Sequence, residues 1–226
     1  MSSDLAPGRV AVSAVMVVHN DEDRGLTRLL RDLLPALWLL RPVLDAELIV
    51  VDNSPARLDR LANAVLDNGA FAGRYCWEGG RNLMYGPSLN LAAGLAQHPY
   101  LLYACAAHGQ SFDPSWAWDL LRPLIDDGDG EVGMAGSLQA SGSPADLGFP
   151  ASLPPVHVQG GVFAARSELI RSHPYPHGPY AHWGSDVYQS FQLMQAGFRL
   201  ADVPTVKSLW RAAPGEGTWK YLHLGG

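Results

Sequence analysis

The sequence predicts an α/β fold with a doubly wound, mainly parallel sheet. Two observations support this prediction. Apolar, β-branched runs alternate with segments of helical leucine spacing over the first half of the chain, as in successive β-α-β units. These runs are also continuously apolar, as expected for parallel strands buried on both faces. With 226 residues, 47% of them hydrophobic, one domain spanning residues 1–226 can bury a full core.

The first half is expected to contain four strands and four helices in alternation. The predicted strands cover residues 9–20, 46–55, 73–78 and 100–106, and the predicted helices cover 25–42, 56–69, 88–97 and 113–126. We expect Pro35 to kink the first helix and Pro42 to help terminate it. Gly69 should end the second helix. Asp113 should be the N-cap of the fourth helix, with Pro114 in its first turn.

The second half departs from this regular alternation. It contains an apolar segment at 131–137, a Pro- and Gly-rich segment at 140–155, a strand at 156–165, a short helix from Ser167, a helix at 185–197 and a strand at 198–206. No repeat or long linker separates domains, so both halves are expected to share one fold.

Charge and composition exclude several function classes. The formal net charge of -6 supplies no basic footprint for nucleic acid or for an anionic membrane surface. The apolar run "VAVSAVMVV" is too short to span a bilayer and lacks the flanks of a signal peptide. Cys76 and Cys105 lack metal-binding spacing and are expected to be buried, reduced thiols. We therefore expect a soluble, cytoplasmic protein without a membrane span.

Polar residues follow three of the predicted strands. They are His19 and Asn20 after the first strand, Asp52 and Asn53 after the second, and His108 after the fourth. Parallel strands align such tips on one edge, where an open α/β sheet binds its ligand. Asp52 is placed there to bind a base or ribose, and the Arg81-Asn82 turn should lie near the same ligand. Alternatively, Asp52, Asn53 and Ser54 form an Asx turn that caps the next helix.

Common catalytic and cofactor patterns are absent. No GxGxxG or GxxxxGK[ST] sequence follows a predicted strand, and no GxSxG sequence occurs, which weakens dinucleotide, P-loop and serine-hydrolase interpretations. His173, His177 and His182 lie in a Pro- and Gly-rich loop and do not share a helix face as in a zinc HExxH site. Asp186 opens a helix, where its charge gains from the helix dipole. The functional alternative is a general base, with Tyr180 and Trp183 forming an apolar platform beside it.

Several segments in this order resemble the family 2 glycosyltransferases of the GT-A fold. They are "AVMVVHN", "LIVVDNS", "NLMYGPSLNLAAGLA", "QGGVFAAR" and "WGSDVYQSFQLMQAGFRLADVPTV". The resemblance covers nearly the whole chain, and its most specific part runs from Ser185 to Pro204. It implies a GT-A fold with a Rossmann-like, nucleotide-sugar-binding half at 1–112 and an acceptor-binding half at 113–226.

The resemblance also implies an activity. Such enzymes move a sugar from a nucleotide-diphosphate donor to an acceptor, usually with inversion of the anomeric centre and a carboxylate base. Asp52 resembles the residue that contacts the base or ribose of the donor. Asp186 resembles the second member of the family's Glu-Asp pair and would be the catalytic base, whereas Ser185 replaces the first member.

The family's metal-binding pattern is missing. Family members usually carry Asp-x-Asp after the fourth strand, where this chain reads "CAAHG", and a later metal-binding histidine is replaced near "SLWR" by Trp210 or Arg211. A leaving diphosphate needs charge compensation, for which His108, the amides of the Gly109 turn, and Arg211 or Lys207 are available. We therefore expect no required cofactor, with Mg²⁺ or Mn²⁺ as the alternative.

The segment "HPYPHGPYAHW" suits an acceptor pocket in which rings stack on a sugar or aromatic face; alternatively, it is a tightly packed, proline- and aromatic-rich loop. The candidate acceptor residues are Gln159, Gly160, Tyr180, His182 and Trp183. The expected partners are a nucleotide-diphosphate sugar and a soluble small-molecule or glycan acceptor; the oligomeric state stays open. A catalytically inactive, sugar-nucleotide-binding or scaffolding GT-A protein is the alternative. A nucleotidyltransferase is disfavoured because its Gly-rich basic loop and metal carboxylates are absent.

Overall fold

A mixed, mainly parallel sheet organises the protein, as the sequence predicts. The computed structural model describes residues 9–106, 113, 115–182 and 184–206. The strands are β1 (Val10–Val18), β2 (Leu44–Asp52), β3 (Ala72–Trp77), β4 (Tyr100–Ala104), β5 (Val132–Ala140), β6 (Val156–Arg166) and β7 (Arg199–Asp202). These described strands form a seven-stranded sheet of order β3-β2-β1-β4-β6-β5-β7, in which β6 is antiparallel to β4 and β5.

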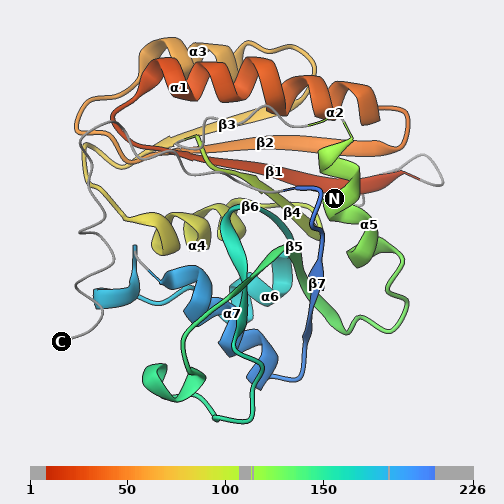
Figure 1. Ribbon diagram of the computed structural model, residues 1–226. Coiled ribbons are helices and arrows are strands. Elements are labelled where there is room, and N and C mark those ends of the chain that lie inside the picture. The colour runs from red at the N-terminus through yellow and green to blue at the C-terminus, as the bar shows by residue number, and fades with distance from the viewer. Residues whose placement is uncertain (1–8, 107–112, 114, 183, 207–226) are drawn as a thin grey trace.

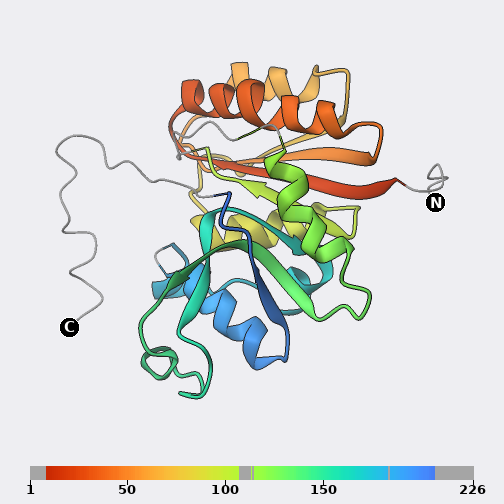
Figure 2. The same ribbon diagram turned by 45° about the vertical axis from the view of Figure 1, so that its right-hand side comes forward.

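Helices cover both faces of the sheet (Figure 1). They are α1 (Glu22–Thr27), the π-helical η1 (Arg28–Leu33), α2 (Leu34–Leu40), α3 (Asp59–Leu66), α4 (Tyr85–Leu95), α5 (Trp116–Ile125), α6 (Ser167–Ser172) and α7 (Ser185–Gln195), with 3-10 turns η2 (Pro144–Leu147) and η3 (Gly178–Tyr180). In the rotated view of Figure 2, α1 and α3 lie on one side of the sheet, and α4 and α7 lie on the other.

Each face of the sheet has its own apolar core. Side chains of β1 alternate between the two, so that Met16 packs with α1 to α3 and α5, whereas Val15 packs with α4, α6 and α7. Both faces of the strand are thus buried, as expected for a strand whose residues are continuously apolar. The register aligns Val18 with Asp52 and Asp52 with Trp77, which places the carboxyl ends of β1, β2 and β3 on one edge.

The first helix differs from the prediction in its bounds and in how it accommodates proline. It begins at Glu22 and ends at Leu40, before Pro42. A π-helical segment precedes Pro35, and the amide of Leu34 donates to the carbonyl of Leu29. Proline cannot donate to the i-4 carbonyl and its ring clashes there, so a wider turn lets the helix continue.

Other element boundaries also required correction. Asp113 is not the N-cap of α5. Ser115 occupies that position, and Oδ1 of Asp113 accepts from the amide of Ser115 at 3.0 Å, which makes an Asx turn. Pro114 lies outside the described residues. Helix α3 covers only Asp59–Leu66 and ends before Gly69, whereas α4 begins at Tyr85, three residues earlier than predicted.

The predicted strands at 100–106 and 198–206 are shorter, at Tyr100–Ala104 and Arg199–Asp202. Cys76 and Cys105 form no disulfide, and both are half-buried rather than fully buried. No helix among the described residues is long and apolar enough to cross a membrane. The assignment of a donor half to 1–112 and an acceptor half to 113–226 stays a prediction.

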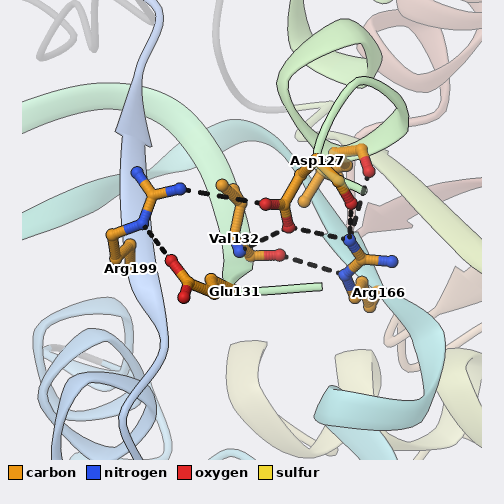
Figure 3. A network of polar contacts seen from close by, with 6 residues as sticks. Asp127, Glu131, Val132, Arg166 and Arg199 are labelled. Carbon is orange, nitrogen blue, oxygen red and sulfur yellow. Dashed lines mark hydrogen bonds and ion pairs between the residues drawn. The ribbon is translucent and has the colours of Figure 1, made fainter. Parts of the chain in front are cut away.

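A polar network holds together the elements at the other edge of the sheet (Figure 3). Asp127, which follows α5, accepts from the amide of Val132 at 2.7 Å and pairs with Arg166 of β6 at 3.0 Å. Arg199 of β7 lies 3.8 Å from Asp127 and 3.2 Å from Glu131. The amide of Val132, together with Arg166 and Arg199, holds the pKa of Asp127 below its usual value, against the opposing effect of burial.

We expect Asp127→Asn to lower the melting temperature by a few degrees at neutral pH. The pKa of Asp127 is lower in the folded protein than in the unfolded chain, where it is near 3.8. The stability that Asp127 contributes to the fold is therefore complete above the pKa of the unfolded chain. It is lost as the pH falls through the lower pKa of the folded protein. The difference between wild type and variant should therefore shrink between about pH 5 and pH 2. Thermal unfolding followed by circular dichroism across this range measures it. Asp129→Asn, an exposed change in the same loop, is the control, and a difference that is constant with pH would contradict the interpretation.

Candidate active site

The loops after β1 and β2 are joined at the predicted edge of the sheet. Nδ1 of His19 lies 2.9 Å from the carbonyl oxygen of Asn53, and because a carbonyl only accepts, this nitrogen donates. The amide of Asn20 donates to Oγ of Ser54 at 2.7 Å. Asn20 has a positive φ of 51°, a conformation that asparagine tolerates better than most residues. The side chains of His19 and Asn20 are exposed and available at this edge.

Asp52 organises the loop that follows β2. It is 1% exposed, and its Oδ1 accepts from the amide of Ser54 at 2.8 Å. Its Oδ2 accepts from the amide of Leu58 at 3.1 Å and from the hydroxyl of Tyr75 at 2.6 Å. The Asx turn considered as the alternative is therefore present. Contact between Asp52 and the base or ribose of a donor stays a prediction.

Asn53 connects this loop to the start of α4. It is 3% exposed; its Nδ2 donates to Oγ of Ser88 at 2.8 Å, and its Oδ1 accepts from the amide of Leu83 at 3.3 Å. The preceding turn contains Arg81, which is exposed and pairs with Glu78 at 3.6 Å. The structure thus brings the turn containing Arg81 next to the strand tips.

Asn82 shapes the same turn by accepting from the amide of Met84 at 2.8 Å. A Cβ at Gly80 would come within 2.6 Å of the carbonyl oxygen of Pro55, so this turn and the β2 loop approach each other closely. Arg81 and Asn82 therefore lie beside the predicted donor-binding edge, and their contact with a donor stays a prediction.

Asp186 lies in the first turn of α7, after Gly184, whose φ of 76° directs the chain into the helix. Its Oδ1 accepts from the amide of Val187 at 2.9 Å, and its Oδ2 accepts from the amide of Gly160 at 3.0 Å. The side chain keeps 26% of its surface exposed. The carboxylate is thus fixed by backbone donors and still reachable from solvent.

Tyr85 contacts the same residue, Gly160, through its carbonyl group. Its hydroxyl donates to the carbonyl oxygen of Gly160 at 2.6 Å. Burial, followed by the neighbouring Tyr175, Tyr103 and Asp186, raises the pKa of Tyr85 well above its usual value, so the hydroxyl stays protonated and donates. Residue 160 must be glycine in this arrangement, since a Cβ would lie 2.8 Å from the Tyr85 oxygen and 2.9 Å from Oδ2 of Asp186.

The first turn of α4 therefore connects the two sides of the site. Ser88 contacts Asn53 of the β2 loop, whereas Tyr85 contacts Gly160 beside Asp186. The amide of Gly86 also donates to the carbonyl oxygen of Ala181 at 2.8 Å, which ties the segment before α7 to the same turn. The sequence predicts a loop for residues 85–87, and it gives no sign of a role for Tyr85. The only signal was an aromatic residue within the polar stretch "NLMYGPS".

The other proposed acceptor residues lie around Asp186. Tyr180 is half-buried and stacks on Tyr188 of α7, with ring centroids 6.0 Å apart. His182 is exposed, and its carbonyl oxygen accepts from Oγ of Ser185 at 3.2 Å. Gln159 is half-buried and precedes Gly160 on β6. Trp183 lies outside the described residues, and binding of an acceptor by the others stays a prediction.

Within residues 9–106, 113, 115–182 and 184–206, no group of three His, Cys, Asp or Glu side chains is placed to hold a metal ion. Ser185, at the position of the family's first carboxylate, is 1% exposed and bonded to the backbone. His108 and Gly109, proposed to contact the diphosphate, lie outside the described residues, as do Lys207 and Arg211.

Comparisons with known proteins agree with this architecture. No family model matches the chain, and no curated protein matches it. Among solved structures, a mannosyltransferase from Pyrobaculum calidifontis, in complex with GDP-Man and Mn²⁺, has a TM-score of 0.66 and 18% identity over 91% of this chain and 59% of that one. The chain thus spans less than two thirds of that protein.

Two synthases are also similar. A glucosyl-3-phosphoglycerate synthase from Mycobacterium tuberculosis, bound to Mn²⁺, UDP-glucose and phosphoglyceric acid, has a TM-score of 0.57 and 18% identity over 92% of this chain and 73% of that one. A mannosyl-3-phosphoglycerate synthase from Rubrobacter xylanophilus has a TM-score of 0.55 and 22% identity over 86% of this chain and 66% of that one. At these identities the likeness establishes the fold: the chain has the GT-A fold found in these glycosyltransferases.

Proposed function

We propose that the protein is a glycosyltransferase that uses a nucleotide-diphosphate sugar, with Asp186 as its general base. The observation that carries this proposal is the placement of the Asp186 carboxylate. It is 26% exposed and held by the amide of Gly160 at 3.0 Å. Gly160, whose amide holds this carboxylate, is connected through α4 to the loops at the carboxyl ends of the strands. The similarity of the fold to sugar-nucleotide-dependent enzymes supports the same proposal.

The proposed step is a direct displacement. The acceptor oxygen attacks the anomeric carbon while its proton passes to the carboxylate of Asp186. The bond between the anomeric carbon and the diphosphate oxygen breaks, and the diphosphate leaves with the electron pair. A single displacement inverts the anomeric centre, so an inverting, family 2-like reaction belongs to this proposal.

The donor would bind along the strand tips, and the acceptor beside Asp186. The proposed donor residues are His19, Asn20, Asp52, Asn53, Arg81, Asn82, His108 and Gly109, and the proposed acceptor residues are Gln159, Gly160, Tyr180, His182 and Trp183. We propose transfer to a soluble small molecule or glycan in the cytoplasm, without a required metal. The lack of a disulfide between Cys76 and Cys105 is compatible with a reducing compartment.

We expect at least one nucleoside diphosphate or its sugar conjugate to bind the full chain equally well in EDTA and in Mn²⁺. Calorimetric titration with UDP, GDP, ADP, dTDP and their sugar conjugates measures this under both conditions. Affinities that agree within about threefold, a difference near 0.6 kcal/mol, would support a cation-free donor site. Binding that requires Mn²⁺ would contradict metal independence. No binding under either condition would contradict the transferase proposal, and binding without any turnover would favour the inactive alternative.

A further inference from the structure

His157 is a buried, titratable residue beside the proposed base, and no sequence motif points to a role for it. It lies on β6, opposite Gln139 of β5, on the part of the strand that extends beyond the end of β4. The residue is 8% exposed. Buried histidines in strands are commonly part of the core, so its significance depends on what the imidazole faces.

The imidazole faces Asp186. Nε2 of His157 lies 3.9 Å from Oδ2 of Asp186, the same oxygen that accepts from the amide of Gly160. This distance exceeds that of a hydrogen bond, so a neutral ring leaves the carboxylate to its backbone donors. A protonated ring at the same distance would form an ion pair.

The packing fixes the distance between the two side chains. The amide of Val158, next to His157, donates to Oγ of Ser190 on α7 at 3.1 Å, and Ser190 is fully buried. Gly160 of β6 donates to Asp186 of α7. Strand and helix are thus joined by two hydrogen bonds next to the contact, which hold the backbones of His157 and Asp186 close together.

His157 is a described neighbour of Asp186 whose charge can change in acid. Other titratable groups that face Asp186 include Tyr85 of α4 and Tyr175, which follows α6, and burial raises the pKa of both well above their usual values, so they stay neutral. Burial lowers the pKa of His157 below 6.5, opposed by the charge of Asp186 and by the backbone of Gln139. The imidazole is therefore neutral at pH 7.5, and it takes up a proton only at a pH below 6.5.

We propose that His157 is a positioning residue for Asp186, whose protonation converts their contact into an ion pair that holds the carboxylate toward β6 and weakens it as a base. This inference rests on the proposed function, because it assigns a regulatory group to the proposed base. Neutral His157 permits proton transfer from the acceptor, whereas protonated His157 suppresses it.

The electrostatic contact can be tested without any enzymatic assay. An NMR titration of the histidine ring signals gives the pKa of His157 in the wild-type protein and in Asp186→Asn. Because the charge of Asp186 raises the pKa of His157, its removal should lower that pKa further. The ring signals of His98, two residues before β4, serve as the control and should be the same in both proteins. An unchanged pKa of His157 would overturn the coupling.

The effect on the base can be tested by the pH dependence of turnover with the donor identified by titration. In the wild type we expect kcat to fall as the pH drops through the pKa of His157. In His157→Gln, which cannot take up this proton, the ratio of variant to wild-type kcat should rise on the order of tenfold as the pH falls from 8 to one unit below the pKa that the NMR titration gives for His157. The KM for the donor should be similar in both, since the donor site is untouched. A structural role alone would lower kcat equally at all pH values, and that result would overturn the proposal.

Controls separate this inference from the proposed function. His98→Gln should keep the wild-type pH profile. If His157→Gln does not fold, His157→Asn is the second variant, with the same expected profile. A wild-type protein that turns over no donor would refute the transferase function, and the NMR titration alone would then decide whether His157 and Asp186 are coupled.

Discussion

Asp186→Asn should reduce turnover by a factor on the order of 10² to 10⁴, which is the contribution expected of a positioned general base. The amide is isosteric and keeps an oxygen that can accept from the amide of Gly160, so the local structure should persist. It cannot take up the acceptor proton. Release of nucleoside diphosphate from the sugar donor, measured at saturating donor, gives kcat for both proteins.

Two further measurements make the result of Asp186→Asn specific. Donor affinity by calorimetry should be unchanged, and the loss of a charge at the start of α7 should cost only about 0.3 to 1 kcal/mol of stability. Asp67→Asn, an exposed change after α3, is the matched control and should retain full activity. A variant with Asn at position 186 that keeps more than about half of the wild-type kcat would show that Asp186 is not the base.

Gly160→Ala should abolish turnover although it adds only a methyl group. The new carbon would lie 2.8 Å from the hydroxyl oxygen of Tyr85, 2.9 Å from Oδ2 of Asp186 and 3.1 Å from its Cβ. Since one of these groups must move, the carboxylate loses its place against the strand. A displacement of about 1 Å in a reacting group can cost on the order of 10² in rate.

Stability gives the second readout for Gly160→Ala. Overpacking should lower the free energy of unfolding by about 1 to 3 kcal/mol, measured by urea denaturation. Gly94→Ala is the matched control, because no atom lies within 4 Å of a Cβ at this helical position. It should leave kcat unchanged and stabilise α4 by about 0.5 to 1 kcal/mol. Wild-type turnover in Gly160→Ala would contradict the proposal that Gly160 holds the carboxylate of Asp186 in place for catalysis.

The fold could be predicted largely from sequence because its dominant signals are local. The apolar runs of β1 and β2 and the leucine spacing of α1 to α2 each determine an element without reference to distant residues. The predicted boundaries of helices and strands were wrong where contacts with distant residues determine them. The sequence "MYGPS" indicates a loop, yet it forms the first turn of α4, whose start is fixed by Asn53 from β2 and by Ala181.

The candidate site was predictable only in part, for the same reason. Asp186 stood out because an acidic residue opens an amphipathic helix within a recognisable pattern. Tyr85 and His157 did not, because a single aromatic residue in a turn and a single histidine in a strand are indistinguishable from core residues in a sequence. Their relevance comes from contacts with Gly160 and Asp186, and Tyr85 reaches Gly160 across 75 residues of chain.

The most direct test of the central claim is the stereochemistry of sugar transfer, followed by ¹H NMR in the wild-type protein and in Asp186→Asn. The donor identified by titration is incubated with the full chain, with water as the acceptor, and the configuration of the first-formed sugar is read from its anomeric proton. We predict an inverted anomeric centre, with product formation lost in Asp186→Asn. Retained configuration, or equal product formation by both proteins, would contradict Asp186 as the general base of a single displacement.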